Sequence, residues 1–151
     1  MAETAQSEVG ETFAFFNEIG IISQLSRAFM EARLPDGLLL PHFSVCNHLL
    51  RVKDGQTPLA LAKAFQVPKT TMTHTLSGLE KRNLVELKPN PKDGRSKCVW
   101  ITDAGRTFRD ATIQSLGPDF AVLAQSITPE ELRQALPILT KVRQILDEAR
   151  D

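Results

Sequence analysis

Apolar residues recur at helical spacing near the middle of the chain and predict a helix with one buried side. Met72, Leu76 and Leu79 form the apolar stripe of a helix over residues 69–82. Asn83 follows this helix, and asparagine suits the left-handed residue that ends one. The opposite side carries short or slender polar side chains, which can lie close to a groove and hydrogen-bond to base edges and phosphates. These residues are Lys69, Thr70, Thr71, Thr73, His74 and Ser77.

Two short alternating segments follow this helix and predict a β-hairpin. Residues 84–88 and 97–102 alternate as strands do, and residues 89–96 between them are rich in turn-forming residues. The pair Asp93-Gly94 lies near the tip of the predicted loop. The basic residues of the loop and its edge are Lys92, Arg95 and Lys97.

Three helices are predicted before this stretch. Apolar spacing places them over residues 8–32, 41–52 and 58–65. The third helix has Thr57 as its N-terminal cap and Pro58 at its first position. This third helix, its short connection and the helix over residues 69–82 form a helix-turn-helix unit.

The segment after the hairpin predicts a long helix and a final one. The long helix runs from a cap at Thr102 or Asp103 to about residue 126, and Gly117-Pro118 should kink or break it. Residues 128–131, Thr-Pro-Glu-Glu, form a capping box that starts the last helix.

The last helix has a heptad seam, with apolar residues in alternating steps of three and four. Pro137 lies inside this helix and predicts a bend. The seam residues are Leu132, Ala135, Leu139, Val142, Leu146 and Ala149.

The first helix contains an aromatic cluster, Phe13, Phe15 and Phe16, which is unusually apolar for the start of a chain. These rings could pack within one protomer or across a dimer. We favour the dimer, because helix ends near a terminus fray unless something covers them.

Three motifs in the central stretch together resemble the winged helix-turn-helix of the multiple-antibiotic-resistance regulator (MarR) family. Residues 71–74 with residues 79–85 resemble its recognition helix and the exit from that helix. Residues 93–97, Asp-Gly-Arg-Ser-Lys, resemble the motif of its wing, and residues 101–105 the step into its long fifth helix. Each motif alone is weak, but their order and spacing are fairly specific.

The sequence departs from the family pattern at four positions. His74 and Leu87 stand where arginine is common, Asn83 where glycine is usual, and Pro68 replaces a serine cap. These departures concern base preference rather than fold.

The resemblance implies a mainly α fold with a small β-hairpin wing, in one domain over residues 1–151. A winged helix-turn-helix lobe at about 38–102 would be joined to dimerisation helices at about 8–34 and 103–150. The chain would then be a homodimeric, sequence-specific regulator of transcription that binds a roughly palindromic operator in double-stranded DNA. Repression is the common mode in the family.

The expected DNA contacts divide between helix and wing. Arg95 would reach a minor groove from the wing tip, and Asp93 would hold Arg95 or the loop backbone rather than face DNA. Lys92 and Lys97 would attract phosphates. On the helix, Thr71, Thr73, His74 and Ser77 would lie nearest to bases, with Lys69 and Thr70 at the helix start.

Charge is distributed unevenly along a chain whose net charge is zero. Residues 69–109 contain nine Lys or Arg against four Asp or Glu, whereas the segments before and after them are net acidic. A basic middle between acidic ends fits a surface that faces DNA, and a solvated face is the other reading.

Composition points to a globular domain of ordinary apolar content in a reducing cytoplasm. Two cysteines give no disulfide framework, no apolar run approaches a membrane span, and the first residues do not resemble a signal peptide. No zinc spacing, phosphate loop or catalytic motif is present, so we expect neither an enzyme nor a metal or other cofactor. Cys46 is expected to be an inert apolar residue, and Cys98 lies near basic residues of the hairpin.

Relatives in the MarR family bind small aromatic or phenolic effectors between their dimer helices and their DNA-binding lobe. By that resemblance, Phe13, Phe16, Leu38 and His42 are candidates for an effector pocket. A surface position is the alternative for His42, and Trp100 is expected to pack in the wing.

A second class of function stays open, because some winged helices bind proteins and not DNA. The basic wing and the hydroxyl-rich helix argue against a protein-interaction module. A steep loss of affinity for random duplex DNA with added salt would support DNA binding.

Overall fold

The structure, a computed structural model, describes residues 2–150, with their side chains from residue 6 onward. The chain divides into two compact units with a boundary between residues 114 and 115. The first unit holds α1 (Ala2–Glu31), three short helices, a two-stranded sheet and α5 (Asp103–Ser115). The second holds α6 (Gly117–Leu123) and α7 (Pro129–Glu148). The mainly helical fold with one β-hairpin is the fold that the sequence predicts.

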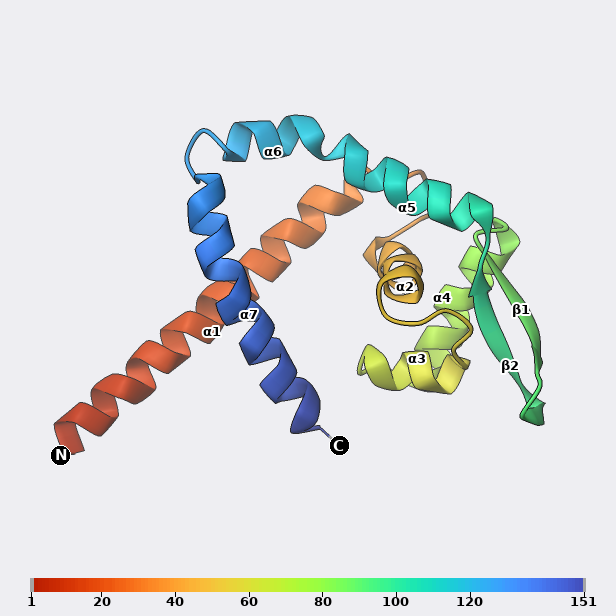
Figure 1. Ribbon diagram of the computed structural model, residues 1–151, viewed down its shortest axis with the longest axis horizontal. Coiled ribbons are helices and arrows are strands. Elements are labelled where there is room, and N and C mark those ends of the chain that lie inside the picture. The colour runs from red at the N-terminus through yellow and green to blue at the C-terminus, as the bar shows by residue number, and fades with distance from the viewer. Residues whose placement is uncertain (1, 151) are drawn as a thin grey trace. The chain divides into compact units, whose positions relative to one another are not determined.

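The core of the first unit lies between three helices and the hairpin (Figure 1). The helices are α2 (Leu40–Arg51), α3 (Pro58–Ala64) and α4 (Lys69–Lys81). Each contributes one apolar side, and the hairpin covers the cluster with its buried strand residues. The fully buried residues include Val45, Cys46, Leu49, Leu61, Leu76, Leu79, Val85 and Val99.

Local signals fix the ends of α3 and α4. The Thr57 hydroxyl accepts the Ala60 N–H at 3.2 Å, with Pro58 in the first helical position as predicted. Asn83 has a φ of 57°, which confirms the left-handed residue expected after α4. Gln66, with a φ of 54°, makes the same kind of turn between α3 and α4, and the sequence did not single it out.

The hairpin is longer than its sequence pattern indicates. β1 (Val85–Asn90) pairs antiparallel with β2 (Asp93–Ile101), so most of the predicted loop at 89–96 is strand, and that prediction was wrong. The chain reverses at Pro91-Lys92, because Asn90 pairs with Asp93 on either side of these two residues. The next pair along the ladder joins Pro89 to Lys97. Residues 94–96 are therefore extra on β2 and bulge from the ladder.

The base of the hairpin is tied to the turn before α3. Gln56 and Val99 form an isolated bridge, in which the Val99 N–H donates to the Gln56 carbonyl at 2.8 Å. The Asp54 carboxylate accepts the Ile101 N–H at 3.0 Å. Directly after β2, the Thr102 hydroxyl accepts the Gly105 N–H at 3.0 Å and so caps α5.

The long α1 keeps large apolar residues exposed along most of its length. It begins earlier than predicted and ends one residue before the predicted end. Val9 is 70% exposed, Phe13 is 69% exposed and Leu25 is 67% exposed. Single exposed apolar residues are normal on a protein surface, whereas large exposed apolar patches are uncommon.

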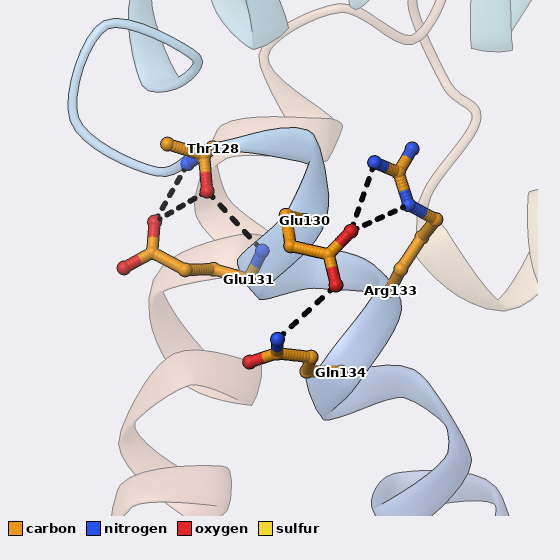
Figure 2. Close-up of polar contacts among 5 residues, drawn as sticks. All are labelled: Thr128, Glu130, Glu131, Arg133 and Gln134. Carbon is orange, nitrogen blue, oxygen red and sulfur yellow. Dashed lines mark hydrogen bonds and ion pairs between the residues drawn. The ribbon is translucent and has the colours of Figure 1, made fainter.

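The second unit starts where the predicted long helix breaks. Gly117-Pro118 begins α6 rather than continuing α5, because proline cannot donate the backbone bond that a continuous helix needs. The capping box that starts α7 is confirmed (Figure 2): the Thr128 hydroxyl accepts the Glu131 N–H at 3.2 Å, and the Glu131 carboxylate accepts the Thr128 N–H at 2.8 Å. Helix α7 continues across Pro137, and the bend expected there stays a prediction.

Within residues 2–150, none of the helices combines the length and the apolar character that crossing a membrane requires.

Candidate nucleic-acid interface

Helix α4 presents a polar side outward and an apolar side to the core. Met72, Leu76 and Leu79 are buried as predicted, and Thr75 is buried with them. The Thr75 hydroxyl donates to the Thr71 carbonyl at 3.2 Å, which satisfies a polar group inside the core. The residues of α4 that were predicted to contact DNA lie on its outer side. Five of them are exposed and Ser77 is half-buried; the exposed residues are Lys69, Thr70, Thr71, Thr73 and His74.

Side-chain and backbone hydrogen bonds organise the tip of the wing. The Asp93 carboxylate accepts the Arg95 backbone N–H at 3.0 Å. The Asn90 side chain accepts the Lys92 N–H at 3.0 Å and donates to the Ser96 hydroxyl at 2.9 Å. These bonds shape the bulge so that the Arg95 side chain extends from a fixed backbone.

Asp93 therefore makes the backbone contact predicted for it. Asn90 and Ser96 were not singled out from the sequence. They become organising residues only because the chain reverses two residues earlier than the Asp-Gly pair suggests.

The cations of this surface have no acidic partners, unlike most arginines elsewhere. Across the described residues, no ion pair or side-chain hydrogen bond engages the charged groups of Lys69, Lys92, Arg95 or Lys97. By contrast, Arg27 pairs with Glu31, Arg106 with Asp54, Arg109 with Asp110, Arg133 with Glu130 and Arg143 with Asp147. Unpaired cations remain available to an anionic partner.

A groove of about 540 Å³ lies between the wing and the starts of α3 and α4. Lys69 lines it from α4, and Arg95 and Lys97 line it from β2. Polar groups from Thr57, Asn90 and Ser96 complete its wall, with Leu87 at its side. Three cations around one groove make a positive channel beside the polar side of α4, and Asp93 is its one acidic lining residue.

A second, smaller cavity of about 180 Å³ lies between α2 and the buried side of α4. Its walls are mostly apolar, and Arg27 of α1 stands at its edge. The lining residues are Arg27, Leu40, Pro41, Ser44, Val45, Phe65, Val67, Thr71, Met72 and Thr75. No sequence pattern indicates this cavity, because its lining residues come from four separate segments.

The four residues predicted for an effector pocket do not meet within one chain. Leu38 is buried in the core, and His42 lies at the start of α2. Phe13 and Phe16 line an open hollow on α1 instead. Phe16 lies about 22 Å along the helix from Glu31, whose carboxylate accepts the Leu40 N–H at 3.1 Å.

The two cysteines are buried in the lobe. Burial raises the pKa of the Cys46 thiol to about 12, so this group stays protonated and unreactive at neutral pH. Cys98 is 7% exposed on β2. Trp100, which was expected to pack in the wing, lies against Gly55 in the turn before α3 and is 41% exposed. Among the described residues, no group of three His, Cys, Asp or Glu side chains is arranged to hold a metal ion.

Comparison with known proteins shows which family this arrangement resembles. The model of the MarR family matches residues 36–96, which span α2 to the wing. Wild-type MarR from E. coli, in its apo form, is 26% identical, with a TM-score of 0.71 over 83% of this chain and 93% of that one. From α2 to the wing the chain is similar in sequence to the MarR family, and it shares the fold of MarR-family structures over most of its length.

Two further MarR-family structures extend the comparison. A cysteine-to-serine mutant of E. coli MarR, complexed with operator DNA, is 25% identical, with a TM-score of 0.69 over 87% of this chain and 95% of that one. The regulator BldR from Sulfolobus solfataricus shares the fold at 23% identity, with a TM-score of 0.71 over 88% of this chain and 96% of that one. The winged helix-turn-helix predicted from three motifs is thus confirmed.

Proposed function

We propose that this chain is a non-enzymatic regulator of transcription that binds double-stranded DNA through α4 and the wing. The observation that carries the proposal is the groove beside α4, where Lys69, Arg95 and Lys97 surround one channel without acidic partners. A channel of this kind attracts a phosphodiester strand, and the exposed polar side of α4 then faces a major groove. The operator-bound MarR structure supports the same use of this fold.

The division of roles follows from side-chain length and position. Thr71, Thr73, His74 and Ser77 would lie nearest to bases, whereas Lys92 and Lys97 would contact phosphates. Arg95 would enter a minor groove from the wing tip, where negative potential attracts a guanidinium group.

The testing experiment is binding to a duplex operator and to random duplex DNA at several salt concentrations. Arg95→Ala should weaken binding to both and reduce the slope of affinity against salt by about one unit. Arg133→Ala is the matched control, because it removes an equal charge from a surface ion pair on α7. An unchanged salt slope in Arg95→Ala would refute the role of the wing. Binding that is flat or absent for every duplex would favour a protein-interaction module.

We propose further that the DNA-binding form is a homodimer. Apolar side chains exposed on α1 and on α7 support this, because each helix carries more apolar surface than a lone protomer needs to expose. On α7, Leu136 is 64% exposed and Leu139 is 43% exposed. A two-fold dimer would place two α4 helices about 34–36 Å apart, which is the reason to expect a roughly palindromic operator.

Sedimentation tests the dimer directly. The wild-type chain should sediment as a dimer at micromolar concentration, and Leu139→Glu should shift it toward the monomer and weaken operator binding. Gln144→Glu adds the same charge at an exposed polar position of α7 and should leave the mass unchanged. A monomeric wild-type chain would overturn this part of the proposal.

Repression released by a small aromatic or phenolic effector is the mode of regulation that we propose. The cavity between α2 and α4 supports it, because a ligand there would contact Met72 and Thr75 on the buried side of the recognition helix. Such a ligand acts only if it binds the DNA-bound and free forms unequally. Arg27 at the cavity edge suits a carboxylate.

Benzoate and phenol are the probes for this effect. Either should reduce operator affinity, and Arg27→Gln should remove the benzoate effect while sparing the phenol effect. Arg51→Gln changes a basic residue of α2 outside the cavity and serves as the control. Operator affinity that neither compound changes would count against an effector at this cavity.

A further inference from the structure

His42 links the start of α2 to the recognition helix α4. Its Nδ1 atom accepts the Leu39 backbone N–H at 2.9 Å, so the ring closes the first turn of α2. On its other side the ring lies against Gly78 of α4, where a Cβ atom would come within 2.8 Å of Nε2. The ring thus fills the space that a side chain at position 78 would take.

The hydrogen bond to Leu39 fixes the protonation state of this ring. A backbone N–H can only donate, so Nδ1 must offer a lone pair and the proton of the neutral ring must sit on Nε2. A second proton on the ring, at Nδ1, would point an N–H group of His42 at the Leu39 N–H group, and two donors cannot form a hydrogen bond. The bond would be lost, and the ring would have to leave its position between Leu39 and Gly78.

The charged surroundings also oppose a positive ring. Burial lowers the pKa of His42, and the positive charges of Arg82, directly after α4, and of His74 on α4 lower it further. Glu31 is the acidic group near this end of α2, and its carboxylate accepts the Leu40 N–H while pairing with Arg27. Asp36 in the preceding loop presents its backbone carbonyl to Arg82.

We infer that His42 is a positioning residue for the recognition helix: its neutral ring holds α4 against α2, and a proton on the ring releases it. The consequence for DNA rests on the function proposed above. His74 lies one turn before Gly78 on α4, so movement of α4 at Gly78 also moves a residue expected to contact bases.

This inference predicts a change of operator affinity with pH that is opposite to the change expected from simple electrostatics. A proton adds positive charge near the DNA-facing surface, and charge alone would strengthen DNA binding at low pH. Release of α4 predicts the reverse, with operator affinity falling as the pH drops below the pKa of His42. One linked proton limits this loss to about tenfold per pH unit.

The first test compares operator affinity from pH 7.5 to 5.5 at constant ionic strength. His42→Asn keeps an acceptor near the position of Nδ1 but cannot titrate, so its affinity should fall less than that of the wild type. His48→Gln is the matched control, because it removes the titration of the other half-buried histidine of α2 and leaves the contact with Gly78 in place. Equal pH dependence in the wild type and in His42→Asn would overturn the inference.

The second test uses the protein without DNA, so that it does not depend on the proposed function. NMR titration of the His42 ring should report a pKa below the ordinary histidine value and the Nε2-protonated neutral form. Hydrogen exchange of the α4 amides should accelerate as the ring gains its proton, and in His42→Asn it should change little over the same range.

A third variant probes the contact from the side of α4. Gly78→Ala should displace the ring and return the pKa of His42 toward its ordinary value, although alanine in place of a helical glycine otherwise favours the helix. If operator binding depends on pH while exchange of the α4 amides does not, the positioning role fails and the DNA-binding function stands. If α4 loosens with the proton but no duplex binds at any pH, the positioning role stands and the DNA-binding function fails.

Discussion

The indole ring of Trp100 lies directly on the backbone of Gly55. A Cβ atom added at Gly55 would come within 2.5 Å of two ring carbons of the indole, and Gly55 has a φ of 71°. The Gly55 N–H also donates to the Val99 carbonyl at 3.0 Å. The wing is therefore joined to the turn before α3 by the contact between the indole and Gly55 and by the hydrogen bond from Gly55 to Val99. The left-handed backbone of Gly55 allows both.

Gly55→Ala should therefore loosen the base of the wing. The left-handed backbone alone costs about 1–2 kcal/mol for a residue with a side chain, and the indole must also move. Urea unfolding should show the lower free energy of unfolding. Because Trp100 is the only tryptophan, its fluorescence in the folded protein should shift toward that of exposed indole.

Gly94→Ala is the control for this change. Gly94 lies in the wing bulge, has open space around its Cα, and lacks the positive φ of Gly55. Its substitution should leave both the stability and the Trp100 emission near those of the wild type. Equal effects at the two glycines would show that the ring contact is unimportant.

Two substitutions of Asp93 can distinguish its structural role from the effect of its charge at the wing tip. Its carboxylate accepts the Arg95 N–H, so Asp93→Ala should disorder the bulge and weaken operator binding. Asp93→Asn keeps an acceptor oxygen and removes a negative charge beside DNA, so it should bind as well as the wild type or more tightly. Tighter binding by Asp93→Ala would mean that charge, and not the backbone contact, governs this position.

The sequence predicted the helices well because each has a strong local signal. Met72, Leu76 and Leu79 gave the buried side of α4, and Thr128 with Glu131 gave the start of α7. These signals lie within one or two helical turns, and the structure bears them out.

The sequence failed where contacts between distant residues decide the outcome. The reversal of the hairpin at Pro91-Lys92 depends on pairing across the ladder, which overrides the local turn signal of Asp93-Gly94. The contact between His42 and Gly78 joins two helices, and the cavity at α4 draws on four segments. No spacing rule within one segment reveals such neighbours.

Acid should destabilise the folded chain through the two histidines of α2. Burial lowers the pKa of both His42 and His48, so the unfolded chain takes up protons more readily than the folded one. The stability that this provides is fully present above the unfolded pKa near 6.5, and it is lost as the pH falls from there through the folded values. Urea unfolding at pH 7.5, 6.5 and 5.5 should show this decline.

His48→Gln and His42→Asn should each reduce this dependence on pH. In the folded chain the His48 Nε2 atom lies 3.1 Å from the Gln56 amide nitrogen, which also donates to the Lys53 carbonyl at 2.9 Å. That geometry requires His48 to accept, and hence to be neutral. A free energy of unfolding that stays constant across this range in the wild type would contradict both assignments.

Cys46 should be unreactive in the folded protein. It is fully buried, and its raised pKa leaves almost no thiolate at pH 8. A thiol reagent such as iodoacetamide should leave Cys46 unmodified until urea unfolds the chain, as peptide mass analysis would show. Modification of Cys46 at the rate of an unfolded thiol under native conditions would require the lobe to open far more readily than its packing indicates.

His74 is the residue whose loss should change the preference among operator variants. It is exposed on the polar side of α4, and an imidazole there can donate to or accept from a base edge. His74→Ala should alter the discrimination between operator variants by roughly 1–3 kcal/mol, if one base pair is the partner. Lys69→Ala is the comparison, because a phosphate contact at the start of α4 should weaken all duplexes alike and lower the salt slope by about one unit. Competition binding with a set of single-base operator variants measures both effects. If His74→Ala weakens binding to every variant equally, His74 contacts the backbone of DNA. Base recognition would then depend on Thr71, Thr73 and Ser77 alone.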